Sequence, residues 1–140
     1  MSEEQDHKFI HLHVHSAYSL AEGAIPVKSL VKRARAMNMP AIAITDSSNL
    51  FGAMEFSLEA SKSGIQPIIG ARVLVGEDEH HLVLLVKDQQ GYLNLSEIIS
   101  RSYLSSDGQS KPRVTWEWVR HYSAGLICLT GGVKGPIGQA

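Results

Sequence analysis

The sequence has a single cysteine, no long apolar run and no excess of charge of either sign. Cys128 cannot form a disulfide within the chain, so the disulfide framework of small secreted proteins is excluded. No apolar stretch approaches the roughly 20 residues that are needed to span a bilayer. The acidic start at 1–6 is not followed by the hydrophobic segment of a secretory signal. These absences predict a cytoplasmic protein.

The charge balance argues against a dedicated nucleic-acid-binding module. Thirteen Lys and Arg residues stand against fourteen Asp and Glu residues, which gives a formal net charge of −1. A dedicated nucleic-acid-binding module normally has a basic excess or a basic stripe. The one basic run, at 28–35, is equally typical of a solvated helix face. A length of 140 residues fits one globular domain or a large part of one.

Apolar runs that are typical of strands alternate with amphipathic stretches. Helices are predicted at about 27–37, 53–63, 92–103 and 115–121, where apolar residues recur every three or four positions. Strands are predicted at 9–14, 41–45, within 65–75, at 82–86 and at 126–129. This alternation favours an α/β sheet or barrel with mainly parallel strands. The units are too few to close a (β/α) barrel, so we expect a fragment of a longer chain.

The segment Phe9-Ile-His-Leu-His-Val-His-Ser16 has the most informative pattern. Alternate side chains of a strand share a face, so His11, His13 and His15 are predicted to point the same way. Two imidazoles from one strand suit a divalent metal such as zinc, and neighbouring carboxylates can bridge to a second ion. Two adjacent metal ions stabilise the attacking and leaving oxygens of phosphate-ester hydrolysis. The alternative is a half-exposed strand whose histidines bond to backbone carbonyls or water.

An ordered series of short motifs runs through the chain from residue 9 onward. It opens with His13-x-His15-Ser16, Tyr18-Ser19 and Glu22-Gly23, and continues through 40–46, 49–52, 64–70, 81–87, 91–95, 111–113 and 125–127. The series resembles the PHP (polymerase and histidinol phosphatase) domain, in the form found at the N-terminus of bacterial DNA polymerase III alpha subunits. The resemblance implies part of a distorted (β/α) barrel. We expect a flexible N-terminus at 1–8 and the N-terminal portion of a PHP domain at 9–140.

The resemblance carries metal-ligand positions over to four residues of this sequence: His13, His15, Glu22 and His81. Glu22 stands where the family usually has Asp, which exchanges one oxygen ligand for another. His11 and Asp46 are expected to contact the ligand side chains rather than the metal ion itself. For Asp46 this means accepting a hydrogen bond from a histidine N–H, although capping the next helix is the alternative.

Three ligand positions of the family are changed in this sequence. Ser47 replaces a histidine, Arg72 replaces an acidic residue and Gly132 replaces a cysteine. A guanidinium is always protonated and only donates hydrogen bonds, so Arg72 cannot ligate a cation. It is predicted either to take the metal's place by pairing with Glu22 or Asp46, or to point outward at the barrel rim. Both alternatives predict a vestigial site, with no metal or a weakly bound zinc or manganese ion.

The resemblance further implies that polymerase activity and partner docking belong to different parts of the parent chain. The parent chain is expected to be a DNA-directed DNA polymerase whose Mg²⁺-dependent site and DNA contacts lie outside this fragment, which itself has no catalytic residue. This domain is expected to be a scaffold that docks the proofreading exonuclease and other subunits of the polymerase III holoenzyme, with no membrane partner. The alternatives are an active metal-dependent 3′–5′ exonuclease or phosphoesterase, and a free-standing phosphatase.

Overall fold

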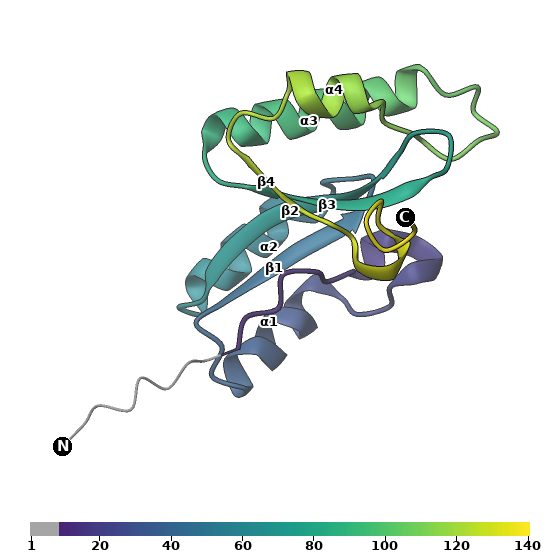
Figure 1. The fold of residues 1–140 in the computed structure, drawn as a ribbon. Helices are drawn as coiled ribbons and strands as arrows, with labels where there is room; N and C mark the ends of the chain where they lie inside the picture. Colours follow the sequence, from purple (N-terminus) through teal and green to yellow (C-terminus); the bar gives the residue numbers. More distant parts are fainter. Residues whose placement is uncertain (1–8) are drawn as a thin grey trace.

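The fold is an α/β arrangement built on one four-stranded sheet (Figure 1). The computed structural model describes residues 9–140, so the N-terminus at 1–8 that we expected to be flexible lies outside the described residues. The strands lie side by side in chain order: β1 (Ala41–Ser47), β2 (Gln66–Val75), β3 (His80–Val86) and β4 (Leu126–Leu129). The α/β class predicted from the alternation of periodicities is confirmed.

The first two long helices form where the apolar spacing predicts them. In α1 (Val27–Ala36) the buried residues recur every three or four positions, and the helix begins directly after Pro26. α2 (Ala53–Lys62) ends shortly before Gly64, whose φ of +71° favours glycine at the end of a helix. Both helices pack against β1 in one core cluster around the fully buried Phe56.

The second half of the chain adds two helices on β2 and β3. α3 (Gln89–Leu104) begins at Asp88, whose carboxylate accepts a hydrogen bond from the Gly91 N–H at 2.9 Å. It buries Leu95 and Ile98 against both strands. α4 (Trp116–His121) begins at Thr115, which caps its first turn. None of the helices among residues 9–140 is long and apolar enough to cross a membrane.

The pairing registers place the helices and a polar cleft on opposite faces of the sheet. Side chains of paired residues share a face, as do alternate residues along a strand. The residues that pack against α1, α2 and α3 come from one face. Ser47 pairs with Arg72, and Arg72 pairs with Val83, two residues after His81. Ser47, Arg72 and His81 therefore project from the other face.

The strand directions correct one prediction. β1 and β2 are parallel, whereas β2 with β3 and β3 with β4 are antiparallel, so the sheet is mixed rather than mainly parallel. Only residues 76–79 separate β2 from β3. A parallel pair needs a crossover of about a dozen or more residues, which this turn cannot supply. Gly76 and Glu79 take positive φ values in the turn.

The predicted strand at 9–14 is also wrong. The segment runs beside β1, where the Ala43 N–H donates to the His11 carbonyl and the Thr45 N–H donates to the Val14 carbonyl. Between these two hydrogen bonds the chain advances by three residues in the 9–14 segment but by only two residues in β1. The regular hydrogen-bond spacing of paired strands is therefore broken. A short 3₁₀ helix that we had not predicted, η1 (Ala17–Glu22), follows this segment.

Candidate functional site

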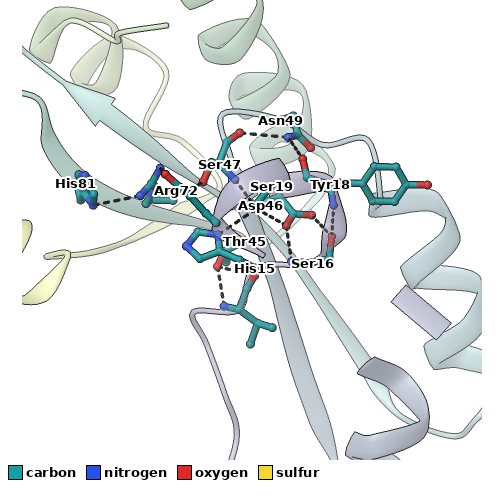
Figure 2. A network of polar contacts seen from close by, with 12 residues as sticks. His15, Ser16, Tyr18, Ser19, Thr45, Asp46, Ser47, Asn49, Arg72 and His81 are labelled. Atoms are coloured by element: carbon teal, nitrogen blue, oxygen red, sulfur yellow. Dashed lines mark hydrogen bonds and ion pairs between the residues drawn. The ribbon is translucent and has the colours of Figure 1, made fainter. Parts of the chain in front are cut away.

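The polar cleft is a surface hollow between η1, the end of β1 and the middle of β2, with Lys111 on its wall. Arg72, which lines this hollow, contacts two of the predicted ligands. One terminal nitrogen lies 2.9 Å from the Glu22 carboxylate, and the other lies 3.3 Å from Nδ1 of His81 (Figure 2). The Ser47 hydroxyl donates to the same Glu22 carboxylate. Of the two partners predicted for Arg72, Glu22 is therefore the one that the structure pairs with it.

These contacts engage the lone pairs that a metal ion would need. A guanidinium has no acceptor, so Nδ1 of His81 must accept and His81 must be neutral with its hydrogen on Nε2. The Glu22 carboxylate accepts from both Arg72 and Ser47. The Arg72 side chain is only 10% exposed, so the positive charge sits inside the cleft rather than at its rim.

Behind the cleft, Asp46 organises a second group of contacts. Its carboxylate accepts hydrogen bonds from the Ser16 N–H at 2.6 Å, the Ser16 hydroxyl at 2.7 Å and the Ser19 hydroxyl at 2.6 Å. Ser19 in turn lies 3.1 Å from Nδ1 of His15. Among residues 9–140, Asp46 thus neither hydrogen-bonds to a histidine directly nor caps α2, whose N-cap residue is Gly52 and which has no side-chain cap. Both contacts predicted for Asp46 are wrong, and it reaches His15 through Ser19.

The three histidines of the N-terminal segment do not act as one group. The His13 and His15 rings lie edge to face with their centroids 5.0 Å apart. The His11 ring instead packs against Phe9 at 4.7 Å and lines a separate hollow beside α1. The expectation of a shared direction therefore fails for His11.

The last of the changed positions, Gly132, has no side chain that could act as a ligand. Gly132 is exposed at the start of η2 (Gly132–Lys134), and a Cβ built on it meets no atom within 4 Å. Its neighbour Gly131 packs directly against the backbone carbonyl of His81. Cys128 is exposed on β4.

Two residues that organise this site, Ser16 and Ser19, were given no role by the sequence patterns. Ser16 precedes η1 and accepts a hydrogen bond from the Tyr18 N–H, so the preference of serine for helix starts was an available signal. Ser19 had no such signal. Its contact with Asp46 joins residues 27 positions apart, which only the tertiary fold brings together.

Comparison with known proteins agrees with the motif series. The PHP domain family model matches residues 11–140. The chain belongs to the PHP domain family. It is 44% identical to the DNA polymerase III subunit alpha of Caulobacter vibrioides over 98% of this chain, which spans only 13% of that relative.

Two solved structures share the fold of this PHP domain. An amidohydrolase from Chromobacterium violaceum, with bound sulfate and no metal, aligns with a TM-score of 0.51 at 25% identity, over 66% of this chain and 32% of that one. A protein from Bifidobacterium adolescentis, provisionally named a metal-dependent phosphoesterase, aligns with a TM-score of 0.52 at 18% identity, over 82% of this chain and 42% of that one. Both likenesses agree with part of a PHP-type α/β barrel.

The PHP cleft in this arrangement does not fit a metal ion. Among residues 9–140, no group of three or more His, Cys, Asp or Glu side chains is placed to hold one. Arg72 also donates to Glu22 and His81 and carries a fixed positive charge. A dication at the same place would meet both charge repulsion and engaged lone pairs.

Burial and nearby charge favour the neutral form of the histidines around the PHP cleft. Burial, followed by the charge of Arg72, lowers the pKa of His15 and of His81 below 6.5. Burial, His15 and Arg72 lower the pKa of His13 in the same way. Burial alone would raise the pKa of Glu22, but the hydrogen bond from Ser47 and the charge of Arg72 outweigh it and lower that pKa.

These shifts predict a loss of stability in mild acid. A histidine with a lowered folded pKa binds protons more readily when the chain is unfolded. Its contribution is therefore complete above pH 6.5 and is lost as the pH falls through the lower folded pKa. Urea unfolding should show a smaller free energy at pH 5 than at pH 7.5. The His81→Gln variant should flatten this dependence, since Gln still accepts from Arg72 but does not titrate.

Proposed function

We propose that the chain is the N-terminal PHP portion of a bacterial DNA polymerase III alpha subunit, a DNA-directed DNA polymerase that acts in DNA replication. The support is 44% identity with one such subunit over 98% of the chain. Because the chain spans only 13% of that relative, we assign the Mg²⁺-dependent nucleotidyl transfer to the remainder of the parent protein.

The domain itself acts as a structural scaffold and as a docking surface for the proofreading exonuclease. The observation that carries this proposal is the Arg72 guanidinium between Glu22 and His81. A tethered cation there balances the Glu22 carboxylate without a metal ion, and it leaves no ion to activate water for phosphate-ester hydrolysis. A partner that supplies proofreading removes the need for metals in this cleft.

Metal content and nuclease activity test the proposal. After dialysis of the untagged parent chain against trace zinc and manganese, mass spectrometry should find near-zero metal in the PHP cleft, and no nucleotides should be released from single-stranded DNA. Binding of the proofreading exonuclease should be unchanged by a chelator, because no metal organises the domain. Two or three tightly held metal ions, together with metal-dependent nucleotide release, would instead establish the active exonuclease.

A further inference from the structure

The hydroxyl group of Ser19 has all of its hydrogen-bonding capacity in use. A serine hydroxyl has one hydrogen to donate and two lone pairs that accept. The hydrogen goes to Oδ1 of Asp46 at 2.6 Å, because a carboxylate only accepts. The Ser47 N–H donates to Ser19 at 3.1 Å and takes one lone pair. Nδ1 of His15, at 3.1 Å, meets the remaining lone pair and must therefore carry a hydrogen (Figure 2).

The surroundings keep this direction of donation from reversing. Asp46 is 2% exposed and Ser19 is 6% exposed, so bulk water does not compete for their groups. The Ser47 N–H is held in place because Ser47 pairs with Arg72 at the end of β1. Two N–H and O–H donors from Ser16 also keep the Asp46 carboxylate oriented. Ser19 thus has a fixed acceptor on one side and a fixed donor on another.

We propose that Ser19 is a positioning residue that locks His15 in the Nδ1–H tautomer, with Asp46 as the anchor, so that the Nε2 lone pair of His15 stays available. Among the described residues, none donates a hydrogen bond to that nitrogen. The tautomer of a histidine is set by the hydrogen bond that its other nitrogen makes.

His15 and His81 therefore carry their hydrogens on different ring nitrogens. Arg72 holds His81 with its hydrogen on Nε2 and uses its Nδ1 lone pair. Ser19 holds His15 with its hydrogen on Nδ1 and leaves Nε2 as an acceptor. Of these two histidines, His15 is therefore the one whose second ring nitrogen can accept a hydrogen bond.

The tautomers can be read directly from the ring-nitrogen chemical shifts of the ¹⁵N-histidine-labelled chain at a pH where the histidines are neutral. We expect protonated Nδ1 for His15 and protonated Nε2 for His81. This measurement needs no variant, so it stands even if a substitution prevents folding. A His15 ring with its hydrogen on Nε2 in the unaltered chain would overturn the proposal.

Matched variants separate positioning from stability. Ser19→Ala should shift the His15 tautomer ratio toward Nε2–H by about fivefold, the effect of one hydrogen bond of ordinary net strength. Ser61→Ala removes an exposed serine hydroxyl in the last turn of α2 and should leave the His15 ratio unchanged. Ser19→Thr restores a hydroxyl and should restore the Nδ1–H form. An unchanged ratio in folded Ser19→Ala, or an equal shift in Ser61→Ala, would show that Ser19 does not set the tautomer.

Discussion

Replacing Ser47 by His together with Arg72 by Glu should turn the PHP cleft into a site that binds divalent metal ions. Arg72→Glu removes the cation that pairs with Glu22 and releases the Nδ1 lone pair of His81. Ser47→His places an imidazole where a hydroxyl now donates to Glu22. Both new side chains are ligands that zinc accepts. We expect the affinity for zinc or manganese to rise by about 100-fold or more, measured by competition with a chelator.

The controls for this variant isolate the gain of ligands from the change of charge. Arg72→Gln removes the positive charge but adds no carboxylate, so its affinity should lie between those of the original chain and the double variant. Lys28→Glu makes a charge reversal on the exposed face of α1, away from the cleft, and should leave metal affinity unchanged. If the double variant binds no more tightly than the original chain, the lost ligands at these two positions are not what limits binding.

The order of helices and strands follows from the sequence because each depends on local periodicity. The apolar residues of α1 recur every three or four positions, and their burial alone places that helix against β1. Strand direction is different, because it depends on how the chain turns between strands. The continuous apolar run of β3 is compatible with a parallel or an antiparallel neighbour, and the short turn at 76–79 decides between them. Periodicity therefore predicts the elements better than their directions.

In the candidate site, too, some features follow from the sequence and others require the tertiary structure. That Arg72 cannot ligate a metal follows from the chemistry of its side chain alone. That it pairs with Glu22, 50 positions away in the sequence, depends on η1 lying across the end of β1. The irregular match between the 9–14 segment and β1 likewise separates His11 from His15, although strand alternation predicts a common face. Residue chemistry was thus predictable, whereas the choice of partner required the tertiary structure.

The largest loss of stability should follow from Asp46→Ala. The Asp46 carboxylate accepts three hydrogen bonds from Ser16 and Ser19 in a site that is almost completely buried. Its removal leaves one backbone N–H and two hydroxyls without an acceptor, and each costs about 1–3 kcal/mol. We therefore expect the free energy of unfolding, measured with urea, to fall by at least about 3 kcal/mol.

Asp88→Ala is the matched control, since it also removes a carboxylate that accepts from a backbone N–H. Asp88 is exposed and makes one such bond, to Gly91 at the start of α3, so its loss should cost about 1 kcal/mol. Similar losses for the two variants would mean that water enters the Asp46 site and satisfies the freed groups. A clearly larger loss for Asp46→Ala is what a buried, water-free anchor requires.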